Sequence, residues 1–81
     1  MVSTHYFGRR EAERRFPHRI DIRVPALGLG GRLSAMLTWC RQNLRAGAWD
    51  MHWQAAIPPD YVRFYFMSEA NAEAFRRRWG R

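Results

Sequence analysis

The feature that most constrains the fold of this chain is a pair of alternating hydrophobic and polar runs in residues 48–67. The first run covers residues 48–57, the second covers residues 61–67, and Pro58, Pro59 and Asp60 stand between them. Alternation with a period of two is typical of β-strands, and a turn signal between two such runs predicts a β-hairpin. A hairpin alone is marginally stable in water, so we expect helices to cover its hydrophobic face.

The two faces of this predicted hairpin differ in chemistry, because successive side chains of a strand point to opposite sides. One face carries the hydrophobic side chains Trp49, Met51, Trp53, Ala55, Ile57, Val62, Phe64 and Phe66. The other face carries Asp50, His52, Gln54, Tyr61, Arg63, Tyr65 and Met67. We expect the first face to enter the core and the second to be the surface available for function.

Three further elements are predicted outside the hairpin. Residues 18–24 alternate hydrophobic and charged side chains and predict a strand. Residues 32–44 carry hydrophobic side chains at helical spacing, and residues 69–79 predict a second helix with Ser68 as its N-cap and Gly80 at its end. The predicted core is Ile20, Ile22, Val24, Leu33, Met36, Leu37, Cys40, Leu44, Trp53, Phe64, Phe66 and Phe75.

The glycine-rich segment 27–31 lies between the predicted strand and the first predicted helix. A turn of this kind at the start of a helix can bind phosphate. The dinucleotide fingerprint and the Gly-Lys-Ser/Thr motif are both missing, so the segment favours a flexible connection.

The order strand, helix, strand, strand, helix over residues 18–80 resembles the ferredoxin-like sandwich, which includes the RNA-recognition motif. This resemblance implies an α+β fold of the βαββα type, with two helices packed on one face of a small antiparallel sheet. Residues 61–67 lack the glycine found in the third strand of the RNA-recognition motif, and no fourth strand is predicted after the second helix. The resulting sheet edges invite pairing with another chain, for example in a homodimer.

Residues 1–17 are predicted to be separate from the α+β domain of residues 18–81. Within them, residues 2–7 have the pattern of a short strand and residues 9–16 that of a short helix ended by Pro17. The alternative is a mobile basic arm, because chain termini are often poorly ordered unless they dock. For such an arm, the sequence favours a solvated segment over a dedicated nucleic-acid-binding one.

Neither a catalytic set nor a metal site is apparent in the sequence. His5, His18 and His52 lack the spacing of metal ligands, and Cys40, the single cysteine, is expected on the core face of its helix. We therefore expect a non-enzymatic protein without a metal or organic cofactor. A single cysteine and the absence of a signal peptide or an apolar run of membrane-spanning length predict a cytoplasmic protein with no membrane span.

The formal net charge is +7, and all fourteen basic side chains are arginine. Guanidinium groups make forked contacts with phosphate and carboxylate, which predicts an anionic partner. Nucleic acid is the first expectation, because aromatic and arginine side chains on one face can stack bases and neutralise phosphates. The alternative is a protein partner, either an acidic surface or a second copy of the chain. The predicted binding residues are Arg19, Arg23, His52, Tyr61, Arg63, Tyr65, Arg76, Arg77 and Arg78.

Overall fold

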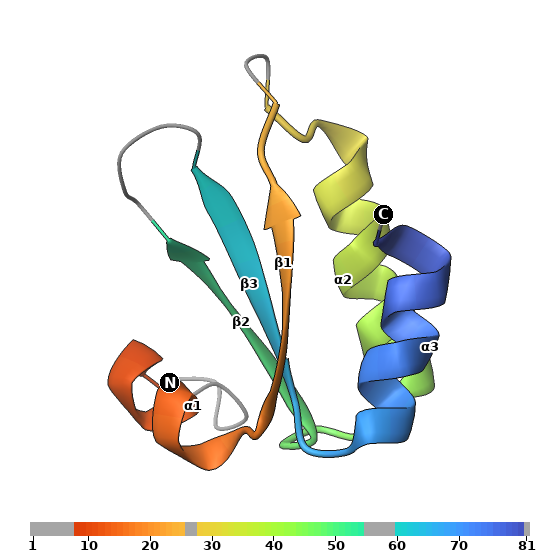
Figure 1. Ribbon diagram of the computed structural model, residues 1–81. Coiled ribbons are helices and arrows are strands. Elements are labelled where there is room, and N and C mark those ends of the chain that lie inside the picture. The colour runs from red at the N-terminus through yellow and green to blue at the C-terminus, as the bar shows by residue number, and fades with distance from the viewer. Residues whose placement is uncertain (1–7, 26–27, 55–59, 81) are drawn as a thin grey trace, which may run out of the picture.

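The chain folds around an antiparallel sheet of three strands, and its computed structural model describes residues 8–25, 28–54 and 60–80. Three helices accompany the sheet (Figure 1). In chain order the elements are α1 (Arg9–Arg15), β1 (His18–Arg23), α2 (Gly31–Asn43), β2 (Trp49–Gln54), β3 (Tyr61–Phe66) and α3 (Glu69–Trp79). The result is a small α+β fold, as the sequence predicted, but the order α-β-α-β-β-α does not confirm the ferredoxin-like βαββα arrangement.

Strand β3 lies at the centre of the sheet, between β1 and β2. Phe64 is opposite Ile20 on β1 and opposite Met51 on β2, so the three hydrophobic rows share one face. This register confirms the predicted hairpin and the predicted strand near residue 20. The predicted strand residues 55–57 and the turn residues Pro58 and Pro59 lie outside the described residues.

Helices α2 and α3 cover the hydrophobic face of the sheet (Figure 1). Phe75 of α3 packs between two aromatic rings of β3, with its centroid 4.6 Å from that of Phe64 and 5.2 Å from that of Phe66. Most predicted core residues are buried, and the partly buried ones pack against the same cluster. The buried cluster consists of Ile20, Ile22, Met36, Cys40, Trp49, Val62, Phe64, Phe66, Ala72 and Phe75. Of these, Trp49, Val62 and Ala72 were not in the predicted core.

Trp53 corrects the predicted core, because 49% of its surface is exposed. It is the next-to-last residue of β2, and that end of β2 lies away from α2 and α3 in Figure 1. Alternation therefore gave the correct face for Trp53, but it could not show where the helical layer stops.

The ends of α3 follow the sequence prediction only in part. The Ser68 hydroxyl accepts a hydrogen bond from the Asn71 amide at 3.0 Å, which confirms the predicted N-cap. Gly80 follows the last helical residue, and its amide donates to the Arg76 carbonyl at 2.8 Å. Its φ of −81° is not left-handed, so the helix ends without the glycine-specific conformation that was expected.

The first helix, α1, packs on the sheet face opposite α2 and α3 (Figure 1). Its residue Ala12 and the following residue Phe16 form a second, smaller hydrophobic cluster with Tyr65 of β3. The centroids of the Phe16 and Tyr65 rings are 6.0 Å apart. Residues 9–15 therefore form the short helix that was one of the two alternatives for this segment. The predicted strand in residues 2–7 lies outside the described residues.

Candidate functional site

The sheet face opposite α2 and α3 brings six of the nine predicted binding residues together. Its side chains form three rows across the strands. The rows are Arg19–Tyr65–Asp50, Asp21–Arg63–His52 and Arg23–Tyr61–Gln54. Sequence alternation thus predicted correctly that these side chains share one face.

Helix α1 covers one end of this face and buries Tyr65 completely. The Tyr65 hydroxyl donates to Glu13 Oε2 at 2.5 Å, and desolvation together with this bond raises the pKa of Tyr65 to about 12. The same hydrogen bond holds the pKa of Glu13 below its ordinary value. Because the Tyr65 ring has no exposed surface, a base has no access to it while α1 is docked.

Arg63 is likewise occupied by partners within the chain. Its Nε donates to Asp21 Oδ1 at 2.8 Å, its Nη1 donates to Glu13 Oε2 at 3.0 Å, and its Nη2 donates to the Tyr61 hydroxyl at 3.2 Å. The hydrogen bonds to Asp21 and Glu13 raise the pKa of Arg63 above its ordinary value. Glu13 also forms an ion pair with Arg19. Two acidic side chains therefore balance two of the arginines that were predicted to bind a partner.

His52 belongs to a polar cluster at the far side of β3. Its Nε2 lies 3.3 Å from Oδ2 of the buried Asp50, and its ring meets the Tyr65 ring edge-on with centroids 5.8 Å apart. Asp50 also accepts a hydrogen bond from the Met51 amide at 2.8 Å. The ring contact with Tyr65 thus joins His52 to β3, and Asp50 contacts His52 from within β2.

The arginines at the end of α3 lie on the helical layer and are not part of the sheet face. Arg76 and Arg77 contact Glu73 at 3.1 and 3.8 Å, and the Arg78 guanidinium carbon lies 4.4 Å from the Trp79 ring centroid. All three side chains remain exposed. The structure therefore divides the predicted binding residues between two separate surfaces.

The outer edge of β1 is the site that sequence analysis did not locate. The Val24 amide donates to the Asp60 carbonyl at 3.0 Å, so the backbone of residue 24 points toward β3. In an antiparallel pair this orientation alternates along the strand. The N–H and C=O groups of Arg19, Asp21 and Arg23 therefore point outward, and no strand of the described part of the chain pairs with them.

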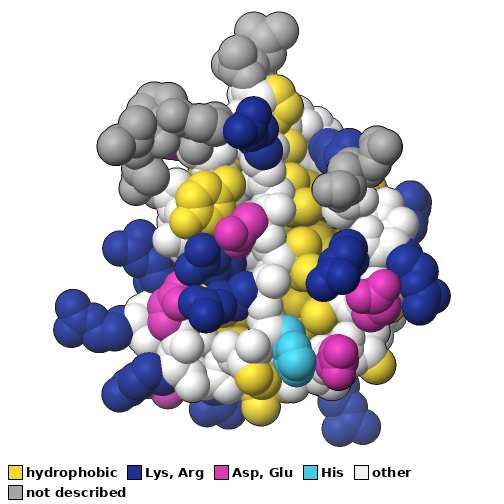
Figure 2. Space-filling view, viewed as in Figure 1, with side chains coloured by type: hydrophobic (Ala, Val, Ile, Leu, Met, Phe, Trp, Pro, Cys, Tyr) yellow, Lys and Arg dark blue, Asp and Glu magenta, His cyan; other side chains and the backbone are white. Residues whose placement is uncertain are grey.

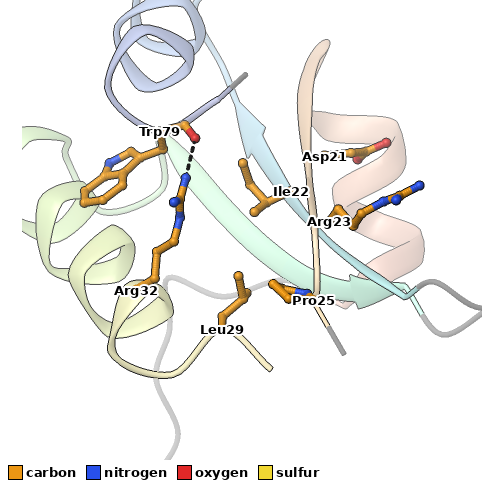
Figure 3. Close-up of a pocket in the computed structure, with 7 residues that line it drawn as sticks. All are labelled: Asp21, Ile22, Arg23, Pro25, Leu29, Arg32 and Trp79. Atoms are coloured by element: carbon orange, nitrogen blue, oxygen red, sulfur yellow. Dashed lines mark hydrogen bonds between the residues drawn. The ribbon is translucent and has the colours of Figure 1, made fainter. Parts of the chain in front are cut away.

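A groove, here called the β1 groove, runs beside this edge between β1 and the two helices that cover the core. One hollow, of about 310 Å³, is lined by Asp21, Ile22, Arg23, Pro25, Leu29, Arg32 and Trp79 (Figure 3). A second, of about 240 Å³, is lined by Pro17, His18, Arg19, Ile20, Glu69, Ala72, Glu73 and Arg76. Figure 2 shows hydrophobic side chains (yellow) in a column along β1, with arginines (dark blue) on both sides of it.

The two hollows differ in what they can receive. In Figure 3, Ile22 and Leu29 point toward the first hollow, whereas Asp21 and Arg23 point to the opposite face of the sheet. Arg32 borders this hollow, and its Nη2 donates to the Trp79 carbonyl at 2.8 Å, which ties α2 to the end of α3. The first hollow thus has a hydrophobic floor, whereas charged side chains surround the second.

No three His, Cys, Asp or Glu side chains in the described part of the chain lie close enough together to hold a metal ion. Burial raises the pKa of the Cys40 thiol to about 12, so this cysteine is a poor nucleophile. None of the described helices combines the length and hydrophobicity needed to cross a membrane.

Comparisons of the chain with protein-family models, with curated proteins and with solved structures found no match.

Proposed function

We propose that this chain is a non-enzymatic binding module that takes up an extended, anionic segment of a partner protein along the outer edge of β1. One observation carries the proposal. The outward N–H and C=O groups of Arg19, Asp21 and Arg23 lie beside the β1 groove, whose larger hollow has a hydrophobic floor and which arginines border. A peptide backbone can satisfy such an edge, and alternate side chains of the peptide can enter the groove.

The charge of the chain supports an acidic partner. Seven acidic side chains stand against fourteen arginines. Of those acids, Glu13 and Glu73 each contact two arginines, so the arginines still outnumber their partners. The groove is bordered by Arg19 and Arg23 on the sheet side and by Arg32 and Arg76 on the helix side. Acidic side chains of a bound segment therefore gain favourable interactions where they lie beside these arginines.

Nucleic acid is the second candidate, supported by the +7 charge and by exposed arginines such as Arg41, Arg45 and Arg77. The sheet face favours it less. Tyr65 is buried, and Arg63 makes ion pairs with Asp21 and Glu13. A free strand edge beside a hydrophobic groove also matches a peptide backbone better than it matches a sugar–phosphate chain.

The two candidates are separated by parallel titrations with poly-glutamate and with single- and double-stranded oligonucleotides at two salt concentrations. We expect poly-glutamate to bind and to shift the backbone amide resonances of residues 19–23. If oligonucleotides bind instead, their affinity will fall by about 0.7–0.9 log units per log unit of salt for each phosphate neutralised. If oligonucleotides bind and the amide resonances of β1 do not shift, nucleic acid is the partner and the proposed peptide binding at β1 is wrong.

A further inference from the structure

We infer that the segment bound at β1 carries acidic side chains opposite Arg19 and Arg23 and a large hydrophobic side chain opposite Ile22. This inference rests on the proposed function and adds a residue pattern to it. An antiparallel partner strand runs from the residue opposite Arg23 to the residue opposite Arg19. In that order, its five side chains are acidic, large and hydrophobic, neutral, small and uncharged, and acidic. The pattern follows from three features of β1 and the β1 groove.

The first feature is the direction of the outward backbone groups. Arg19, Asp21 and Arg23 present their N–H and C=O groups to the outer edge, so a partner strand pairs through the residues opposite these three. Side chains directly opposite one another lie on the same face of a sheet. Every second partner side chain therefore lies on the face of Arg19 and Arg23, and the intervening ones lie over the β1 groove.

The second feature is the shape and chemistry of the groove. The partner residue opposite Ile22 lies over the hollow of about 310 Å³, where Ile22, Pro25 and Leu29 provide hydrophobic surface. The residue opposite Ile20 lies over the smaller hollow, which Glu69 and Glu73 border. A large hydrophobic side chain fits the first position, and a small uncharged one fits the second.

The third feature is the charge on the sheet face of β1. Arg19 and Arg23 flank Asp21, which already pairs with Arg63 at 2.8 Å. Opposite charges directly across two strands stabilise the pair, and like charges destabilise it. Arg19 shares Glu13 with Arg63, whereas Arg23 makes no ion pair within the described residues. We therefore assign the larger effect to the acidic residue opposite Arg23, and a neutral residue to the position opposite Asp21.

A second copy of the chain satisfies this pattern poorly. The symmetric antiparallel pairing of two β1 strands centred on Asp21 places the two Asp21 side chains opposite each other and Arg19 opposite Arg23. Sliding one strand by two residues pairs Asp21 with Arg23, but it also places Arg19 opposite Pro25, which has no backbone N–H. Two copies also repel each other, since each carries a charge of +7.

Two five-residue sequences of identical composition, each placed between neutral flanking residues, test the pattern. The matching peptide is Glu-Leu-Thr-Ala-Glu, and the control is Leu-Glu-Thr-Glu-Ala. We expect the matching peptide to bind at least tenfold more tightly and to slow hydrogen exchange at the amides of Arg19, Asp21 and Arg23. Equal affinity with the same slowed amides would overturn the residue pattern and leave strand addition standing. If neither peptide slows these amides, the proposed function fails as well.

Two N-methylated peptides test pairing through the backbone without changing the protein. Methylation of the Thr amide, which is opposite Asp21, removes a hydrogen bond to β1, whereas methylation of the Ala amide changes a group that faces away from β1. We expect at least a tenfold loss of affinity for the first peptide and a small change for the second. Equal losses would contradict strand addition.

Two variants at Arg23 separate its charge from its backbone amide. We expect Arg23→Ala to weaken the matching peptide several-fold, and Arg23→Pro to weaken it by a further tenfold because it also removes an outward N–H. Proline is tolerated on an edge strand where its nitrogen faces outward, so Arg23→Pro should keep its circular dichroism spectrum. Sedimentation of the free protein completes the test by giving its oligomeric state. If the free protein is a dimer in which the outward amides of β1 already exchange slowly, a second copy of the chain occupies this edge.

Discussion

At the scale of single residues, Glu13 is the side chain that connects α1 to the sheet. It accepts hydrogen bonds from Tyr65 at 2.5 Å and from Arg63 at 3.0 Å, and it pairs with Arg19. These partners lie 6 to 52 residues away from Glu13 in the sequence. Glu13 therefore occupies Tyr65 and Arg63 on the face that the sequence predicted to be open.

Tyr65→Phe tests this contact, because it removes the hydroxyl that donates to Glu13 and keeps the ring against Phe16. We expect the free energy of unfolding to fall by about 1.5 kcal/mol, at the lower end of the range for hydrogen bonds to a charged group, because Glu13 is partly exposed. Urea denaturation measures the change. Tyr61→Phe is the matched control, and an equal or larger loss for Tyr61→Phe would contradict the assigned role of Tyr65.

The pH dependence of stability tests the same site. The hydrogen bond from Tyr65, with help from Arg63, holds the pKa of Glu13 below 4.5 in the folded chain. A carboxyl with a lowered folded pKa stabilises the fold above its unfolded pKa and loses that contribution as the pH falls through the folded value. We expect the free energy of unfolding to decrease below about pH 4.5, and to decrease less steeply in Glu13→Gln. Identical pH profiles for the two proteins would show that Glu13 carries no such linkage.

At the scale of elements, α1 is the least expected part of the fold. Ala12 and Phe16 are one helical turn apart and bury one side of this helix against Tyr65. The two larger helices are tied together independently of α1 by Arg32, which donates to the Trp79 carbonyl at 2.8 Å. We therefore expect α1 to detach more easily than α2 or α3.

Phe16→Ala should release α1 without unfolding the rest of the chain. Truncation of a buried phenylalanine typically costs about 3–5 kcal/mol, and this small cluster has fewer partners than the main core. We expect hydrogen exchange to become faster in α1 and at Tyr65 and to change little in α3. Uniformly faster exchange throughout the described residues would contradict the independence of α1.

The sequence predicted most of the helices and strands, but it did not predict which parts of the sheet the helices cover. Alternation and helical spacing identified three strands, two helices and the two sheet faces, because both signals are local. They could not show that α1 covers Tyr65, since the Glu13–Tyr65 contact joins distant parts of the chain. Trp53 was placed in the core for a similar reason, because the extent of the helical layer is not a local property. Among the predicted binding residues, Arg19 and Arg23 lie on β1, at the edge of the sheet. Tyr65 and Arg63, in contrast, form hydrogen bonds with other residues of the chain.

At the scale of the whole molecule, the two faces of the sheet and the edge of β1 have different roles. One sheet face forms the main core with α2 and α3, the other is partly closed by α1, and the edge of β1 stays unpaired within the described residues. The arginine excess remains exposed around this edge and on α3. Rising salt should therefore weaken binding of an acidic segment moderately, because salt screens the contacts between charges but not the backbone pairing or the hydrophobic contact.

The most direct test of the proposed binding edge is residue-resolved hydrogen exchange along β1, with and without a saturating acidic peptide. In the free chain, the amides of Arg19, Asp21 and Arg23 should exchange rapidly, whereas those of Ile20 and Ile22, which face β3, should exchange slowly. Bound peptide should slow the three outward amides and so remove the alternation. If the peptide binds and the three outward amides still exchange rapidly, the edge of β1 is not where the partner binds.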